Sequence, residues 1–172
     1  ESNPKADLSG DDVKSKIQIL SSLAFNCFIN NSNINLEGIN SVDEIDINNA
    51  NMLGYKIKHI GLTEINNGKL IQRVNPCFVK KDSRLSNVNG VLNAVIIESD
   101  PVGKTVLQGE GAGPGPTTSA LVSDLCSILK GNVKFPFSIS HKCRKKIKSI
   151  NISDKVFSSY IRLDVVDKKG VL

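Results

Sequence analysis

The sequence predicts a fold of the α/β class, of the α+β type, with a mixed, largely antiparallel-containing sheet and helices mainly on one face. Two observations predict it. Segments with helical spacing of apolar residues stand near the start of the chain, near residue 45 and near residue 120, and the segments between them alternate apolar and polar residues as strands do. A chain of 172 residues, 40% of them hydrophobic, is also long enough to bury a core.

A first helix is expected over residues 10–25. Ser9 precedes it as a favourable N-cap, and Asp11 and Asp12 place negative charge in its first turn. Residues 29–42 are polar and rich in turn-forming residues, so we interpret them as a loop.

A second helix is expected over residues 43–53, because Gly54 follows and glycine often ends helices. The next segments are expected to be strands, because their residues alternate in polarity and turn-forming residues separate them. These strands are residues 55–65 and 69–79, joined by a turn at 66–68, and residues 90–99 and 104–110, joined by a turn at 100–103.

A third helix is expected over residues 116–131, with a proline in its first turn and a glycine at its end. Residues 132–157 show no sustained period, and we interpret them as a linker or a docking arm. Residues 158–165 alternate again and predict a further strand, which needs a partner because a lone strand is marginally stable.

Composition excludes several classes of protein. No apolar run is long enough to span a bilayer and no signal-peptide pattern is present, so a membrane partner is not expected. The four cysteines are scattered without a CxxC pair, which argues against a zinc site and against a disulfide framework. A cytoplasmic protein without a bound metal is therefore expected.

The charge is uneven along the chain. The net charge is +5, and the five Lys and Arg residues of HKCRKKIKS, residues 141–149, equal that whole excess. A local basic run is usually a solvated connector. No aromatic residue alternates with the basic ones, so nucleic acid ranks last among the partners considered and is not expected.

Asp12 and Lys16 form an informative pair in the first helix. They fall inside the apolar arc of a helical wheel, and because they are four residues apart their side chains can meet. Two interpretations are open: a structural ion pair, and a proton-transfer site in a cleft, with Glu1 and Asp7 as further carboxylates for a cationic substrate. The wheel places Val13, Ile17, Ile19, Leu20, Leu23 and Ala24 toward the core, and Asp11, Lys14, Ser15, Gln18, Ser21 and Ser22 toward solvent.

The segment GEGAGPGPT, residues 109–117, follows an expected strand and opens a helix. It is not the dinucleotide fingerprint, which needs glycine where Pro114 stands. A tight structural turn is one interpretation. The other is a binding edge, because glycines let backbone approach a flat ligand and a helix start offers N–H groups.

These two motifs together carry a resemblance. The spacing Glu1-x5-Asp7-x4-Asp12-x3-Lys16 and the block GEGAGPGPTTSALVSDL are similar to the homoserine dehydrogenase family, in order from residue 1 to about residue 129. The resemblance implies a substrate-binding and dimerisation domain over residues 1–131, a basic linker over 132–157 and the truncated start of an ACT-like regulatory domain over 158–172. It also implies that the family's N-terminal Rossmann domain lies outside this sequence, so this chain alone is expected to be inactive.

The resemblance also implies an activity: NAD(P)H-dependent reduction of L-aspartate 4-semialdehyde to L-homoserine in threonine and methionine biosynthesis, by a homodimer that takes NADP or NAD as cofactor. An alternative stays open, a non-catalytic dimerising module that binds an amino acid and regulates. By the resemblance Lys16 is the proton-transfer lysine, and Glu1, Asp7 and Asp12 bind the substrate. Gly113 contacts the nicotinamide side of the cofactor, and Gly111 and Thr117 are its neighbours in the cofactor-binding set.

Overall fold

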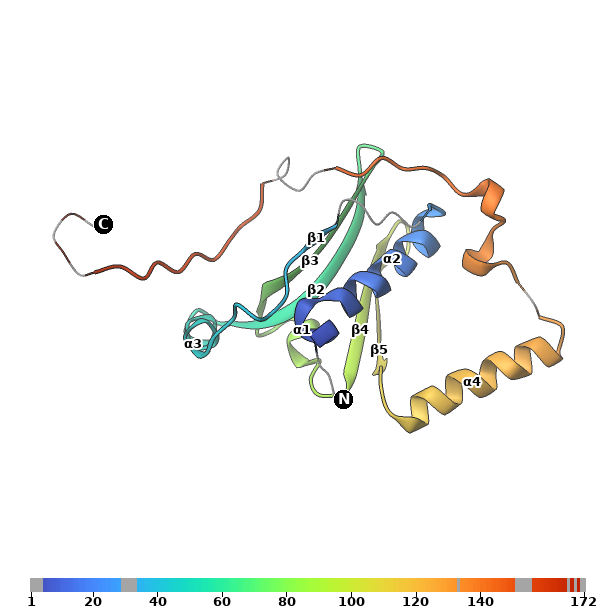
Figure 1. Ribbon diagram of the computed structural model, residues 1–172, viewed down its shortest axis with the longest axis horizontal. Helices are drawn as coiled ribbons and strands as arrows, with labels where there is room; N and C mark the ends of the chain where they lie inside the picture. The colour runs from blue at the N-terminus through green and yellow to red at the C-terminus, as the bar shows by residue number, and fades with distance from the viewer. Residues whose placement is uncertain are drawn as a thin grey trace.

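The computed structural model describes residues 5–28, 34–132, 134–150, 156–166, 168 and 170. Within these residues helices and strands are mixed, which confirms the predicted fold class (Figure 1). The helices are α1 (Lys5–Ser9), α2 (Asp11–Phe25), α3 (Glu44–Met52) and α4 (Pro114–Leu129), with short 3-10 helices η1 (Arg84–Asn87), η2 (Pro136–Ser138) and η3 (His141–Cys143). The strands are β1 (Asn35–Leu36), β2 (Tyr55–Asn66), β3 (Lys69–Lys80), β4 (Leu92–Ser99) and β5 (Gly103–Glu110).

The strands form two sheets in the described residues, where the sequence predicted one. The first has the order β1-β3-β2, and the second is the β4–β5 hairpin. β2 and β3 are antiparallel around the predicted turn, where Asn67 and Gly68 both have positive φ as a tight hairpin requires. β1 pairs parallel with β3, with Asn35 opposite Arg73, and makes this sheet mixed. β1 lies in the segment that the sequence predicted to be a loop. It was not predicted because a strand of two residues is too short to show an alternation of apolar and polar residues.

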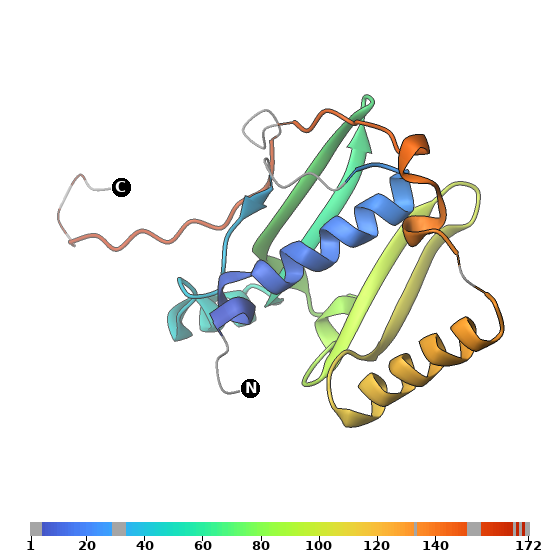
Figure 2. The same ribbon diagram turned by 45° about the vertical axis from the view of Figure 1, so that its right-hand side comes forward.

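α2 lies across one face of the β2–β3 hairpin (Figures 1 and 2). The helix approaches closely at Gly61 of β2, where an added Cβ would be 2.9 Å from Val13 Cγ1 of the helix. A polar network completes the contact, since Gln72 Nε2 donates to Ser21 Oγ at 2.7 Å and Ser21 Oγ lies 2.8 Å from Thr63 Oγ1. The glycine and the network together set which side of α2 faces the sheet.

The helical-wheel prediction for α2 is wrong for much of the helix. Ser21 and Ser22, assigned to solvent, are buried, whereas Ile19 and Leu23, assigned to the core, are each 46% exposed. The predicted N-cap is also wrong, because Ser9 belongs to α1 and the N-cap position of α2 is Gly10.

α3 begins as the sequence predicts. The Asp43 side chain accepts from the Asp46 N–H at 3.0 Å, and the Asp46 side chain accepts from the Asp43 N–H at 3.2 Å, which is a capping box. The helix ends next to Gly54, so the prediction over residues 43–53 is confirmed to within a residue or two.

α4 packs very differently from α2. In both views it lies apart from the β2–β3 sheet, beyond the β4–β5 hairpin (Figure 2), and none of its residues is buried. The chain exposes 12737 Å², against about 8,200 Å² for a compact monomer of 18.6 kDa. The large apolar residues of α4 are exposed by 51% to 77%: Leu121, Val122, Leu125, Ile128 and Leu129.

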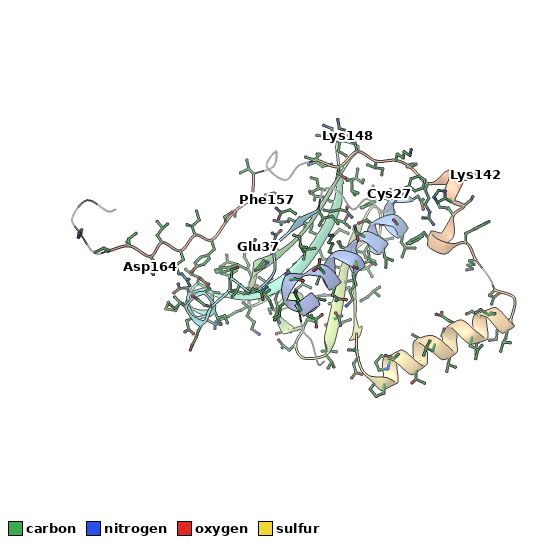
Figure 3. All side chains as sticks on the ribbon, viewed as in Figure 1. Cys27, Glu37, Lys142, Lys148, Phe157 and Asp164 are labelled. Atoms are coloured by element: carbon green, nitrogen blue, oxygen red, sulfur yellow. The ribbon has the colours of Figure 1, made fainter. Side chains whose placement is uncertain are left out.

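Residues 134–150 follow the body of the fold, passing the C-terminal end of α2 and then β3 (Figure 3, labels Lys142, Cys27 and Lys148). Cys27 forms an isolated bridge with Lys145. The Leu70 N–H donates to the carbonyl of Lys148, and the carbonyl of Leu70 accepts from the N–H of Ile150, both at 3.0 Å. These backbone contacts attach the described part of the predicted linker or docking arm to the chain just after α2 and to β3.

Residues 156–166, named here the C-terminal segment, are extended but unpaired in the described part of the chain, so the strand predicted over 158–165 is not formed. The segment instead contacts α3 and β3. The Tyr160 ring stacks on Phe78 with centroids 4.7 Å apart, and Arg162 Nη1 donates to Asp43 Oδ1 at 2.6 Å and to Asp46 Oδ1 at 2.8 Å.

Candidate functional site

The predicted acidic residues and the predicted lysine lie on two consecutive helices. Asp7 is on α1, where it is exposed, and Asp12 and Lys16 are on α2 after the break at Gly10. Glu1, the remaining predicted substrate ligand, lies outside the described residues. Asp7 therefore lies before Gly10, and Asp12 and Lys16 lie in the first half of the helix that follows it.

The predicted contact between Asp12 and Lys16 is confirmed, with Lys16 Nζ donating to Asp12 Oδ2 at 2.6 Å. The side chains are 56% exposed for Lys16 and 39% for Asp12, so the pair does not lie on the buried side of α2 as the wheel predicted. The cause is the orientation of α2 about its own axis. The helix contacts the sheet at Gly61, and in this orientation Ser21 and Ser22 face the core. An exposed pair of this kind contributes about 0–1 kcal/mol, so stability alone gives little reason for it, and the ammonium is open to a substrate.

The glycine turn brings the other predicted residues together. The Gly111 N–H donates to the carbonyl of Val91 at 3.0 Å, and a Cβ on Gly111 would lie 1.7 Å from Asn93 Nδ2 of β4. Gly113 has φ 107 at the N-cap of α4, a conformation that strongly favours glycine. Its carbonyl accepts from the Thr117 side chain at 2.8 Å, which fixes that hydroxyl in the first turn.

The start of α4 is a poor cradle for phosphate. Pro114 and Pro116 occupy its first turn and have no N–H, and the Thr117 N–H already donates to the carbonyl of Gly113 at 3.3 Å, so Gly115 is the one first-turn residue of this helix with an N–H to offer. The same stretch is sterically open, because a Cβ at Gly115 would have nothing within 4 Å and one at Gly113 would meet only Pro116 Cδ, at 4.0 Å. An open glycine surface with few donors suits the flat face of a ring better than a phosphate.

The predicted site has two parts, the acidic residues with Lys16 and the glycine turn. The structure places the described residues of the first part on α1 and α2 and the second part at the start of α4. In both views the start of α4 stands away from α1 and α2 (Figures 1 and 2). Surface hollows lie at the β4–β5 turn and beside the end of α3, and the residues that line them do not include the predicted site residues. Neither of these two hollows is therefore a pocket around Lys16.

Polar residues near the α1–α2 turn were missed by the sequence analysis. Asn75 Nδ2 donates to Asn35 Oδ1 at 2.8 Å and to Glu37 Oε2 at 3.2 Å, at the β1 edge of the sheet (Figure 3, label Glu37). His59 Nε2 lies 2.9 Å from the carbonyl of Glu37. The alternation of β2 was a usable signal, because it places His59 on the same face as Gly61, toward α2.

The cysteines are all free, and in the ranges given above no three His, Cys, Asp or Glu side chains gather as a metal site. Burial raises the pKa of the Cys27 thiol and of the Cys77 thiol. Both therefore remain protonated to higher pH than ordinary cysteines, which argues against a thiolate nucleophile. Across the same described ranges no helix is long and apolar enough to cross a membrane.

Comparison with known proteins gives one consistent family. A family model described as homoserine dehydrogenase matches residues 1–126. The chain is 42% identical over 133 residues to a homoserine dehydrogenase of Synechocystis sp., with 75% of this chain and 31% of that protein covered. It is 36% identical over 178 residues to one of Neisseria gonorrhoeae, with 100% of this chain and 41% of that protein covered.

A solved structure supports the same relationship. The homoserine dehydrogenase of Thiobacillus denitrificans matches with a TM-score of 0.79 at 30% identity, over 88% of this chain and 37% of that one. The chain thus spans 31% to 41% of the length of these relatives.

Proposed function

Because the chain belongs to the homoserine dehydrogenase family, we propose that it supplies the substrate-binding and catalytic part of an NAD(P)-dependent homoserine dehydrogenase. The proposed reaction is the reduction of L-aspartate 4-semialdehyde to L-homoserine, in the cytoplasm, on the route to threonine and methionine. The observation that carries the proposal is the contact of 2.6 Å between Lys16 and Asp12, with the lysine 56% exposed at the start of α2.

Lys16 acts at the substrate oxygen. As the aldehyde carbon is reduced, negative charge develops on its oxygen, and the ammonium of Lys16 donates a proton to form the hydroxyl of homoserine. In the reverse direction the neutral amine accepts that proton. Asp12 accepts a hydrogen bond from Lys16 and so fixes the direction in which Nζ points.

The carboxylates bind the amino-acid end of the substrate. Asp7 and Asp12 lie on either side of the Gly10 turn, and Glu1 precedes them in the sequence. Three acids exceed what one lysine needs, and the ammonium of the substrate would balance the remaining charge. This arrangement would select an amino-acid aldehyde over an uncharged aldehyde of the same length.

The glycine turn fits the nicotinamide side of the cofactor, NADP or NAD, which supplies the hydride when bound. Gly113 and Gly115 leave open space beside the backbone, and the Thr117 hydroxyl is fixed next to them. Gly111 holds the turn against β4. These residues would orient the ring and exclude water from one of its faces.

The test is Lys16→Ala in the complete enzyme, assayed with aspartate semialdehyde and NADPH. Loss of the positioned acid is expected to lower kcat by about 100-fold or more with a smaller change in KM. Lys14→Ala is the matched control, two residues away on the same helix, and it is expected to keep normal turnover. Near-normal turnover in Lys16→Ala would remove the lysine from the mechanism and with it the proposal.

We propose that the functional form is a homodimer. The support is the apolar surface that the chain leaves exposed, above all on α4. Light scattering on this chain is expected to give about twice its mass of 18.6 kDa. A monomer at micromolar concentration would contradict this.

The second candidate function is a regulatory module, and the observation that favours it is the C-terminal segment. We propose that residues 158–172 start an ACT-like regulatory region, joined to the domain of residues 1–131 through 132–157. Tyr160 and Arg162 contact α3, so the segment has a physical route to the catalytic part. Binding of free amino acids by this chain, together with an inactive complete protein, would favour the module over the enzyme.

A further inference from the structure

His59 of β2 lies beneath the turn between α1 and α2, and we propose that it is a positioning residue for the reaction. Its imidazole supports the Gly10 turn and so fixes Asp7 relative to Asp12 and Lys16. The inference rests on the proposed function, because it concerns the geometry of the same acidic residues. It goes beyond that function by adding a residue that touches none of the reacting atoms.

The first step is the contact between the ring and the turn. Gly10 is buried and has φ +87, and an added Cβ there would lie 2.8 Å from His59 Cε1 and 3.1 Å from Nε2. The edge of the imidazole therefore fills the space directly under the backbone of the turn. A smaller or more mobile side chain at position 59 would leave the turn without this support.

The second step is the anchoring of the ring. His59 Nε2 lies 2.9 Å from the carbonyl of Glu37. A carbonyl can only accept, so the proton of this hydrogen bond belongs to Nε2. Glu37 is itself fixed, because its N–H donates to the carbonyl of Val74 in β3 at 2.8 Å. The ring is thus attached to the backbone at the β1 edge of the sheet.

The third step links the same loop to α1. The Ile39 N–H donates to the carbonyl of Leu8 at 2.9 Å, and a Cβ on Gly38 would lie 2.4 Å from that same oxygen. Asp7 is the neighbour of Leu8, so the carboxylate on α1 is located by the loop that also holds the His59 ring.

The fourth step locates α2. Gly61, two residues along β2 from His59, receives α2 in close contact at Val13. Asp12 and Lys16 flank that contact on the helix. The ring of His59 therefore packs under the turn that joins these two held helices, and we infer that it sets the angle between them at Gly10.

The experiment compares His59→Leu and His59→Gln in the complete enzyme. A misplacement of about 1 Å in a binding group can cost up to about 100-fold. We expect His59→Leu to raise KM for aspartate semialdehyde by about 10-fold or more, to leave KM for NADPH unchanged and to lower kcat less than KM rises. His59→Gln keeps an N–H donor at about the reach of Nε2, so it should recover most of the lost affinity.

The matched control is the second histidine of the chain. His141 packs edge-on against Phe28, with centroids 4.8 Å apart, beyond the far end of α2. His141→Leu also removes a ring that packs on a neighbour, here an exposed one, and it is expected to leave both KM values unchanged. A purely structural role for His59 would instead lower the thermal stability of His59→Leu without a selective change in KM for aspartate semialdehyde.

The outcomes separate this inference from the proposed function. A KM for aspartate semialdehyde within about twofold of wild type in His59→Leu, or no recovery in His59→Gln, overturns the positioning role while Lys16→Ala still inactivates the enzyme. Normal turnover in Lys16→Ala overturns the proposed function instead. If His59→Leu does not fold, His59→Asn replaces it, because the asparagine amide is too short to reach Glu37. KM for aspartate semialdehyde must then rise in His59→Asn and not in His59→Gln. Equal KM values in these two variants contradict the inference.

Discussion

α2 and α4 are nearly equal in length, with 15 and 16 residues, yet they pack in opposite ways. α2 buries small polar side chains, with Ser21 at 1% and Ser22 at 0% exposure, and α4 buries none of its residues. The apolar residues of α4 that would fill a core, such as Leu125 at 55% exposure, face solvent in this chain.

The difference teaches what a hydrophobic pattern does and does not decide. Apolar residues at helical spacing predict that a helix forms. Which part of the protein packs on that helix depends instead on where the helix can closely approach the backbone of another element. α2 closely approaches the sheet at Gly61, and the buried Ser21 hydroxyl on α2 is hydrogen-bonded to Thr63 and Gln72. α4 has no such contact in the described chain, so the stability of this chain resides in the α2–sheet contact.

The sharpest test of this comparison is one substitution made both in the sheet that α2 covers and in α4. Leu70 of β3 is 1% exposed, and Leu125 of α4 is 55% exposed. Leu70→Ala is expected to lower the free energy of unfolding by about 2–5 kcal/mol, because it leaves a cavity, and Leu125→Ala by less than about 0.5 kcal/mol. Urea unfolding of the chain measures both. Equal losses would mean that α4 is packed in solution, and the comparison would fail.

A smaller effect is expected from the buried hydroxyl itself. Ser21 Oγ lies 2.6 Å from the carbonyl of Ile17 and accepts from Gln72 at 2.7 Å. Ser21→Ala leaves the Gln72 amide buried with one partner fewer, which costs about 1–3 kcal/mol. Ser123→Ala on the exposed surface of α4 is the control and should be neutral within about 0.5 kcal/mol. No loss in Ser21→Ala would show that the polar network adds nothing to the α2 contact.

The sequence was a good guide to local structure. The β2–β3 hairpin, the β4–β5 hairpin and α3 all stand where alternation, turn residues and the glycine at 54 predicted them. The two residues of β1 and the rotation of α2 were not predictable in this way. The orientation of α2 depends on its contact with Gly61, which is more than 35 residues away in the sequence. A helical wheel shows only the residues of the helix itself, so it cannot include that contact.

The candidate site was predictable in part. Spacing of four residues predicted the Asp12–Lys16 contact, and the glycine-rich block predicted a turn that opens a helix. The sequence did not identify His59 as a site residue. A single polar residue in a strand indicates a role in the site only once the structure shows that the Gly10 turn packs on its side chain. The exposure of Lys16 also required the structure, because it follows from the rotation of α2.

The smallest effect is expected at the surface contact between Arg162 of the C-terminal segment and Asp43 before α3, which depends on charge rather than on packing. The hydrogen bond from Arg162, with a second from the Asp46 N–H, lowers the pKa of Asp43 from 3.8 to about 2. A lowered carboxyl pKa means that the contact contributes fully above the ordinary value of 3.8 and is lost as pH falls through about 2. Docking of the C-terminal segment on α3 should therefore persist at pH 5 and weaken on titration through about pH 4 to 2, and more readily in high salt because the pair is exposed.

NMR titration of the Asp43 carboxyl measures this directly, with the Tyr160 ring signals as a report on docking. Arg162→Gln should return the Asp43 titration toward its ordinary range and release Tyr160 from Phe78 at neutral pH. Arg84→Gln, at an exposed arginine in η1, should change neither. An Asp43 that titrates at its ordinary pKa with Arg162 in place would mean that the C-terminal segment is not held by this contact. The segment would then resemble α4, a surface without a fixed partner in this chain, rather than α2.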